Sequence, residues 1–86
     1  MHEVRIGRSA TKELESLSDK VIARIAAKVD GLAEHPRPAG AKKLVGADDL
    51  WRVRVGDYRI IYSVDDALSV VEIRVIRHRK DAYDRQ

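Results

Sequence analysis

Arginine residues gather in two short stretches of the C-terminal half of the chain. Arg52, Arg54 and Arg59 lie within eight residues. The guanidinium group presents a planar fork of N–H donors that matches two oxygens of a phosphate, and it stays charged at ordinary pH. The second stretch adds four cations, at Arg74, Arg77, Arg79 and Lys80. These residue types predict a site that binds an anion, with phosphate as the best match.

Two residues near the second stretch are candidates for proton transfer. His78 carries an imidazole, which in its neutral form accepts a proton near pH 7. Tyr83 carries a ring that stacks on a base and a hydroxyl that faces a phosphate. The alternatives are that His78 is an ordinary exposed histidine and that Tyr83 packs the tail onto the protein. The chain has no cysteine, and acid pairs such as Asp65-Asp66 are typical of turns. We therefore expect no metal site and no cofactor.

The first three arginines are predicted to share one face of a β-hairpin. Trp51 to Val55 alternates apolar and charged residues, Gly56-Asp57 suits a two-residue type II′ turn, and Tyr58 to Val64 is the return strand. The turn sets five pairs: Val55 with Tyr58, Arg54 with Arg59, Val53 with Ile60, Arg52 with Ile61, and Trp51 with Tyr62. Opposed residues share a face of a sheet, so the arginines lie opposite the apolar face.

Like charges directly opposite each other destabilise a hairpin, here by roughly a few tenths of a kcal/mol for Arg54 and Arg59. A face that keeps such a pair indicates an anion site. The alternative is a solvated strand face whose arginines are paired with acids from neighbouring segments. The second stretch of cations approaches Arg59 if the last strand lies beside the return strand.

The remaining elements must hold this hairpin in place. The second predicted helix has apolar residues at helical spacing, namely Val21, Ile22, Ile25, Val29 and Leu32. The other predicted elements are a strand around Val4 and Ile6, a first helix capped by Ser9, a second helix from Ser18 or Asp19 to His35, an extended piece from Lys42 to Val45, a last strand from Leu68 to Ile76, and a polar tail from Arg77. The fold class is α+β, with an N-terminal strand, a helical hairpin, an antiparallel three-stranded meander and a short C-terminal tail or helix.

Length and composition limit the classes of protein. The chain has 86 residues, a net charge of +3 and 36% charged residues, which predicts one domain over residues 1–86. It has no run of apolar residues long enough to span a membrane and no signal-peptide pattern at Met1 to Arg5, so we expect a cytoplasmic protein. The net charge by itself is too small to identify a nucleic-acid binder.

Three segments resemble one known family: Gly40 to Gly46, Leu50 to Tyr62 and Val75 to Tyr83. Together with the N-terminal strand and helical hairpin, they are similar to the RelE family of toxins of type II toxin–antitoxin pairs, within the RelE/ParE superfamily. The segment from Trp51 to Tyr62 is specific to the superfamily and less specific to one activity in it.

The resemblance implies an endoribonuclease that needs no metal. RelE-like toxins enter the ribosomal A site and cut mRNA there, by attack of a ribose 2′-OH on the adjacent phosphate. By position, Arg52, Arg54 and Arg59 match basic residues of the family's strands. His78 falls where members carry Arg or His, and Tyr83 matches a C-terminal tyrosine. Because arginine is a poor general base, His78 or Tyr83 would transfer the protons.

The resemblance also implies partners and leaves two other functions open. The partners would be a cognate antitoxin protein, bound in a hetero-oligomer, and the ribosome with its mRNA, with no role for a membrane. One alternative is a ParE-like inhibitor of DNA gyrase with no nuclease activity. The other is an RNA-binding module that does not cut.

Overall fold

The computed structural model describes residues 1–46 and 49–80. Its elements run β1 (Glu3–Ile6), α1 (Arg8–Glu15), α2 (Asp19–Glu34), β2 (Lys42–Lys43), β3 (Leu50–Val55), β4 (Tyr58–Asp65) and β5 (Val70–His78). The predicted α+β order is confirmed, and β3, β4 and β5 form the antiparallel meander. The sheet is larger than the meander: its order is β1-β5-β4-β3-β2, with β1 parallel to β5.

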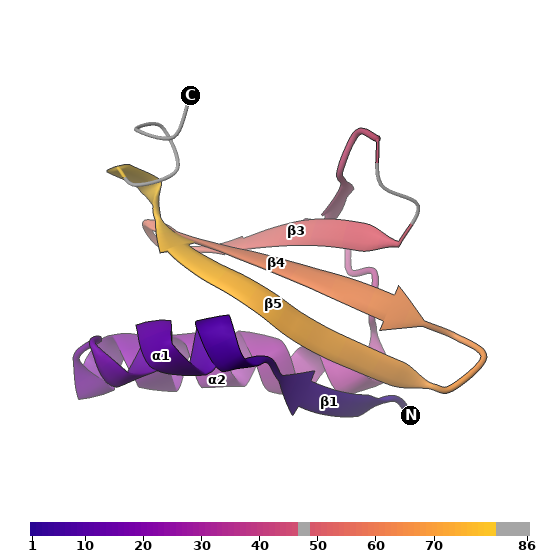
Figure 1. Cartoon of the computed structure of the whole chain (residues 1–86), viewed down its shortest axis with the longest axis horizontal. Helices are drawn as coiled ribbons and strands as arrows, with labels where there is room; N and C mark the ends of the chain where they lie inside the picture. The colour runs from indigo at the N-terminus through magenta and orange to yellow at the C-terminus, as the bar shows by residue number, and fades with distance from the viewer. Residues whose placement is uncertain (47–48, 81–86) are drawn as a thin grey trace.

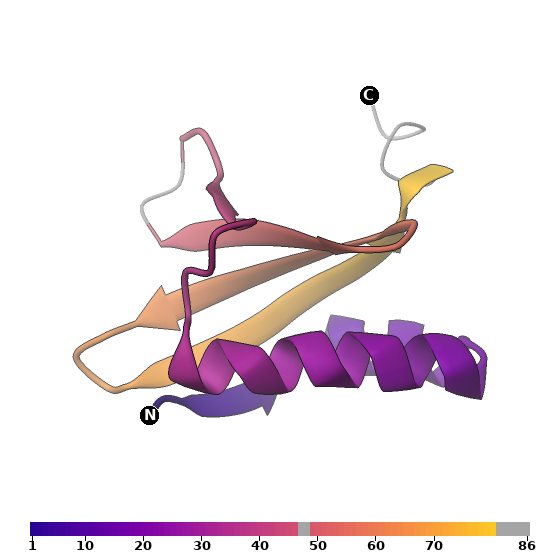
Figure 2. The same ribbon diagram turned by 180° about the vertical axis from the view of Figure 1, so that it is seen from behind.

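Both helices lie against the same face of the sheet (Figures 1 and 2). No helix of the described residues covers the opposite face, which we call the open face. The described part of the chain also contains no helix with the length and apolar character needed to cross a membrane. The architecture therefore places the core on one face of the sheet and leaves the other without a helix of the described residues.

The β3–β4 hairpin has the register predicted from the sequence. Arg54 is opposite Arg59, and Val53 is opposite Ile60. Gly56 has a φ of +57°, which is the left-handed conformation that the first central position of a type II′ turn requires. Glycine adopts this conformation without a steric penalty because it has no Cβ. The predicted turn is thus consistent with the backbone.

Gly56→Ala is expected to destabilise the protein by about 1–2 kcal/mol, because a left-handed φ brings the Cβ close to the following carbonyl oxygen. The new Cβ would also lie 3.1 Å from Nη2 of Arg24. Urea denaturation measures the change. Gly40→Ala is the control, since a Cβ there meets no atom within 4 Å, and an equal loss in both variants would contradict the prediction.

Three predicted elements had wrong boundaries, four in all. Helix α1 begins at Arg8 with Gly7 as its N-cap, two residues before the predicted cap Ser9. The N–H of Gly7 donates to the carbonyl of Ile73 over 2.8 Å, and a Cβ on Gly7 would lie 3.0 Å from that oxygen. Because Gly7 lies this close to β5, it becomes the N-cap and the helix begins at the next residue, Arg8. The extended piece after the helices is also shorter than predicted, because β2 ends at Lys43.

Strand β5 starts later and ends later than the predicted strand from Leu68 to Ile76. The N–H of Leu68 donates to Asp65 Oδ1 over 3.0 Å, and Ser69 has a positive φ of 56°. Both residues therefore belong to the turn. At the other end, Arg77 and His78 pair with β4 and are part of the sheet instead of the tail.

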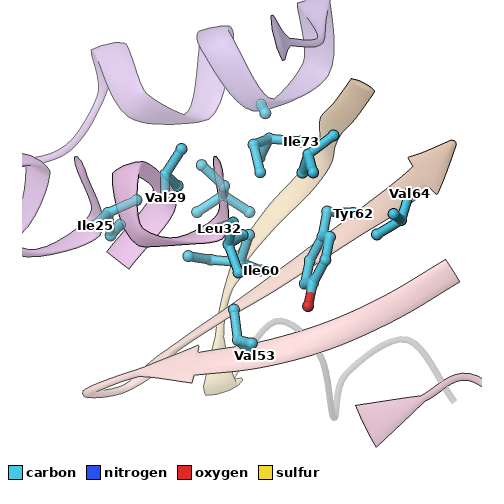
Figure 3. Packing of buried hydrophobic residues seen from close by; sticks show 11 residues of the cluster. Ile25, Val29, Leu32, Val53, Ile60, Tyr62, Val64 and Ile73 are labelled. Carbon is cyan, nitrogen blue, oxygen red and sulfur yellow. The ribbon is translucent and has the colours of Figure 1, made fainter. Parts of the chain in front are cut away.

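The core lies between the helices and the sheet (Figure 3). Helix α2 contributes Ile25, Val29 and Leu32 to it, as the helical spacing predicted. Strand β4 contributes Ile60 and Tyr62, both with no exposed surface. The buried set is completed by Ala10, Val53, Val64, Val71, Ile73 and Ile76. Aliphatic residues thus form most of the core, in keeping with a sequence that has no phenylalanine.

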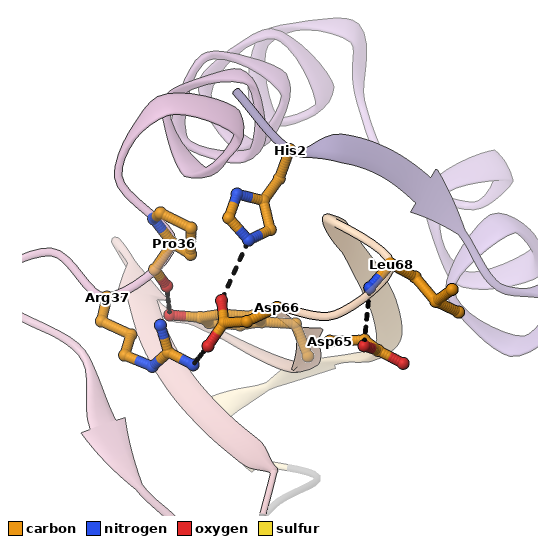
Figure 4. A network of polar contacts seen from close by, with 7 residues as sticks. His2, Pro36, Arg37, Asp65, Asp66 and Leu68 are labelled. Carbon is orange, nitrogen blue, oxygen red and sulfur yellow. Dashed lines mark hydrogen bonds and ion pairs between the residues drawn. The ribbon is translucent and has the colours of Figure 1, made fainter.

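Tyr62 connects the core to the loop that follows α2. Its hydroxyl donates to the carbonyl of Pro36 over 2.7 Å (Figure 4). Burial raises the pKa of Tyr62 to about 12, against about 10 for a tyrosine in an unfolded chain. The folded state therefore keeps a proton that the unfolded state loses, so this contribution to stability is complete below about pH 10 and declines as pH rises toward 12.

Tyr62→Phe is expected to lower the free energy of unfolding near neutral pH by about 0.5–1.5 kcal/mol, the usual worth of one hydrogen bond. It should also flatten the loss of stability above pH 10, because the titrating phenol is gone. Urea denaturation at pH 7 and at several alkaline pH values tests both effects. Tyr58→Phe is the control, since the Tyr58 hydroxyl makes no hydrogen bond to another described residue. Unchanged alkaline sensitivity in Tyr62→Phe would refute the role of its pKa.

Candidate functional site

Three arginines form a row across three neighbouring strands, which we call the arginine row. Arg54 of β3 is opposite Arg59 of β4, and Arg59 is opposite Arg77 of β5. The adjacent residues Val53, Ile60 and Ile76 are buried in the core. Because side chains alternate along a strand, the arginine row lies on the open face.

The charges of the arginine row are not neutralised by neighbouring acids. None of its members forms an ion pair with another described residue. Arg54 is exposed, while Arg59 and Arg77 are half-buried. Each directly opposed pair of like charges costs roughly a few tenths of a kcal/mol, and this row has two of them. For these three arginines, pairing with acids, the alternative weighed from the sequence, is thus not found in the described part of the chain.

Arg52 lies in the next row of the same face. Its neighbours across the sheet are Lys42 of β2 and Ile61 of β4. Arg52 is half-buried and Lys42 is exposed. The open face therefore carries cations from four strands, β2 to β5.

The backbone brings the second stretch of cations to the hairpin. The N–H of Arg79 donates to the carbonyl of Asp57 over 2.7 Å, so the chain after β5 is tied to the β3–β4 turn. A small open hollow lies at this end of the sheet, lined by Arg54, Gly56, Asp57, Tyr58, Arg59 and Arg79. The two stretches that the sequence separates thus meet at one place. Lys80 follows Arg79 and is exposed.

His78 lies at the end of β5 opposite Tyr58. The two rings meet edge to face, with centroids 5.1 Å apart and planes at 88°. Strand alternation puts Arg77 on the open face and His78 on the other side of the sheet's end. Nδ1 of His78 accepts a hydrogen bond of 3.2 Å from the N–H of Lys80. In the neutral ring the proton therefore resides on Nε2.

Besides His78, which lies on the other side of the sheet's end, two predicted site residues are not part of the group around the arginine row. Arg74 lies at the irregularity in the β4–β5 pairing, where it donates to Ser63 Oγ over 3.2 Å and pairs with Glu72 at 3.5 Å. These contacts engage its guanidinium away from the arginine row. Tyr83 lies outside the described residues.

A polar network at the opposite end of the sheet was not found from the sequence (Figure 4). Arg37 Nη2 lies 2.8 Å from Asp66 Oδ2, and His2 Nε2 lies 3.1 Å from Asp66 Oδ1. The hydrogen bond from Arg37 is the main reason that the pKa of Asp66 lies below its ordinary value, and the contact with His2 lowers this pKa further. Arg37 also lies over the ring of Trp51, 5.4 Å from its centroid. No pattern in the sequence relates these residues, because they are far apart along the chain.

Comparison with known proteins places this geometry in a family. Residues 4–83 match the model of the ParE toxin of the parDE type II toxin–antitoxin system. Toxin RelE of Mycobacterium tuberculosis is 32% identical over 83 residues, which cover 95% of this chain and 86% of that protein. The chain belongs to the RelE/ParE family of toxins of type II toxin–antitoxin systems.

Solved structures of this family share the fold. A chain of the archaeal RelE–RelB complex from Pyrococcus horikoshii OT3 has a TM-score of 0.81 and 35% identity, covering 91% of this chain and 94% of that one. A chain of the intact E. coli RelBE toxin–antitoxin complex has a TM-score of 0.79 and 26% identity, covering 91% and 96%. These relatives were crystallised with their RelB antitoxins.

Proposed function

We propose that this RelE-family toxin is an endoribonuclease that cuts mRNA in the ribosomal A site and so stops translation in the cytoplasm. The observation that carries the proposal is the arginine row: Arg54, Arg59 and Arg77 stand side by side on the open face without acidic partners among the described residues. Such a surface attracts a phosphodiester backbone. Its guanidinium groups would also stabilise the negative charge that develops on the phosphate oxygens during cleavage.

The proposed reaction is an attack of the ribose 2′-oxygen on the adjacent phosphorus. The new O–P bond closes a cyclic phosphate, and the bond to the 5′-oxygen of the next nucleotide breaks. The proton of the 2′-OH passes to a base, and the leaving 5′-oxygen takes a proton from an acid. Negative charge accumulates on the phosphate oxygens meanwhile. Arg52, Arg54 and Arg59, with Arg77, are the donors that stabilise this charge.

His78 and Tyr83 are the proposed residues for proton transfer, because a guanidinium does not release its proton near pH 7. His78 lies next to Arg77 in the chain and at the same end of the sheet as the hollow beside Arg59. Its Nδ1 accepts the N–H of Lys80 and Nε2 carries the proton of the neutral ring, so the ring would accept a proton from RNA only after the Lys80 N–H leaves Nδ1. Arg79 and Lys80 are proposed to bind neighbouring phosphates.

Single-turnover cleavage of ribosome-bound mRNA by His78→Ala and Tyr83→Phe tests these roles. We expect at least one variant to cut about 10²- to 10⁴-fold more slowly, the usual contribution of a general acid or base. His35→Ala is the matched control, because it removes an exposed histidine of the loop after α2. Near-wild-type rates for both test variants would sink the proposed chemistry.

We further propose that an antitoxin of the RelB kind blocks this surface in a hetero-oligomer. Acidic residues of such a partner would pair with the arginine row, and a chain segment could add to an edge of the small sheet. The support is that the relatives were crystallised as RelE–RelB and RelBE complexes.

A second candidate function is inhibition of DNA gyrase, because the matching family model describes a ParE toxin. Expression of the chain in cells distinguishes the two. Rapid arrest of translation with mRNA cut at codon-related positions supports the nuclease. DNA breaks without cut mRNA would support the gyrase inhibitor, and neither effect would point to an RNA-binding module.

A further inference from the structure

Helix α2 carries a second, separate set of cations, which we call the α2 stripe. Its members are Lys20, Arg24 and Lys28, spaced four residues apart. Residues at this spacing lie above one another on a helix, so the three charges form a line along its axis. The stripe borders the apolar side of α2, which packs on the sheet.

The charges of the α2 stripe are not paired with acids among the described residues. Cations four residues apart repel each other and weaken a helix. The acids in the second half of the helix, Asp30 and Glu34, lie about 160° and 120° around the helix from Lys28 at 100° per residue. No member of the stripe forms an ion pair with another described residue. The α2 stripe therefore resembles the arginine row, because both are lines of positive charges that repel one another and have no acidic partners among the described residues.

The α2 stripe is joined to the arginine row around the edge of β3. One hollow there is lined by Arg24, Ala27, Lys28, Arg54, Val55 and Gly56. A second is lined by Lys28, Gly40, Lys42, Arg52, Val53 and Arg54. Arg54 lines both of these hollows and also the one at the end of the arginine row. A continuous band of cations therefore extends from the arginine row on the open face to the α2 stripe, and Arg54 lines all three hollows along it.

The sheet leaves room for this band because β2 is short. It pairs with β3 only at Trp51 and Arg52, so the last residues of β3 have no strand of the described residues beside them on the side near α2 (Figure 2). The guanidinium of Arg24 is held over this end of the hairpin. A Cβ on Gly56 would lie 3.1 Å from Arg24 Nη2 and 3.3 Å from Nη1.

We propose that the α2 stripe and Lys42 bind the phosphate backbone of RNA that extends beyond the nucleotides held on the arginine row. This rests on the proposed function and adds a second binding segment to it. A polyanion with a charge at every nucleotide matches a line of evenly spaced cations. An acidic peptide is the less suitable occupant, because the hollow beside Arg24 is nearly flat and offers only Ala27, Val55 and Gly56 besides its cations, with no deep pocket to anchor a large side chain.

A matched pair of variants of the full chain tests the proposal. Arg24→Gln with Lys28→Gln removes two stripe cations four residues apart. Arg8→Gln with Lys12→Gln removes two cations at the same spacing from α1, which lies along β5. Binding of a 2′-O-methyl RNA, which cannot be cut, is measured by fluorescence anisotropy over a range of salt concentrations. Circular dichroism verifies that each variant is folded.

The stripe variant is expected to bind this RNA at least 10-fold more weakly than the α1 variant. The slope of log K against log salt should also become shallower by about 0.7 for each phosphate that the protein no longer neutralises. Equal binding by the two variants would overturn the proposal. So would a loss of binding to poly-glutamate without a loss of binding to RNA. Cleavage is not needed for this readout, so a failure of the proposed nuclease activity would be seen separately.

Discussion

Arg59→Ala is expected to slow RNA cleavage about 10²- to 10³-fold, the usual effect of removing one preorganised donor to a developing negative charge. Arg59 has the central position of the arginine row, between Arg54 and Arg77. Its guanidinium is therefore the one flanked by cations on both sides. The variant is expected to fold normally, because removing one of three adjacent like charges relieves repulsion.

Two further variants separate charge from geometry at this position. Arg59→Lys keeps the positive charge but removes the bidentate hydrogen bonding of the guanidinium group to phosphate, so we expect a cleavage rate between those of the wild type and Arg59→Ala. Arg8→Ala removes an exposed arginine of α1 and should leave cleavage unchanged. Single-turnover cleavage on programmed ribosomes measures all three. If Arg59→Ala cuts as fast as Arg8→Ala, the arginine row is not the site of phosphate activation.

Ile60→Ala is expected to destabilise the protein by about 2–5 kcal/mol, through reduced burial and the cavity left behind. Ile60 is fully buried and lies between Val53 and Ile76 in the sheet. A domain of this size has a total stability of roughly 4–13 kcal/mol, so the loss is a large part of it. Urea denaturation followed by circular dichroism measures the change.

Ile60→Val is the graded control, with an expected loss of about 0.5–1.5 kcal/mol. Ile60 and Arg59 are neighbours in the chain whose side chains lie on opposite faces of β4. Arg59→Ala should therefore reduce cleavage with little effect on stability, whereas Ile60→Val should do the reverse. A small loss for Ile60→Ala, similar to that for Ile60→Val, would show that the helices are not packed on this strand as described.

The hairpin and the face of its arginines were predictable because both depend on local rules. Side chains alternate along a strand, and a two-residue turn with glycine first sets the register. The pairing of Arg54 with Arg59 follows from these rules and is confirmed. The apolar stripe of α2 followed in the same way from helical periodicity.

Errors arose where distant segments decide a boundary. Ser9 has the chemistry of a helix cap, yet α1 begins earlier because Gly7 approaches the carbonyl of Ile73 on β5. The error at Leu68 was local instead: this residue reads as the start of a strand, but the nearby Asp65 and Ser69 make it part of a turn. Arg77 and His78 read as tail and belong to β5, because β4 extends far enough to pair with them.

The sequence by itself determined the family, the class of fold and two arginines placed side by side on one hairpin, since these depend on motif, periodicity and a single turn. Only the tertiary structure decided that Arg77 completes the row, that Arg79 reaches the hairpin turn, and that the α2 stripe meets Arg54 around the edge of β3. The physical reason is that these neighbours come from separate elements. Their distances depend on how β5 pairs with β4 and how α2 packs on the sheet, which no local pattern in the chain records.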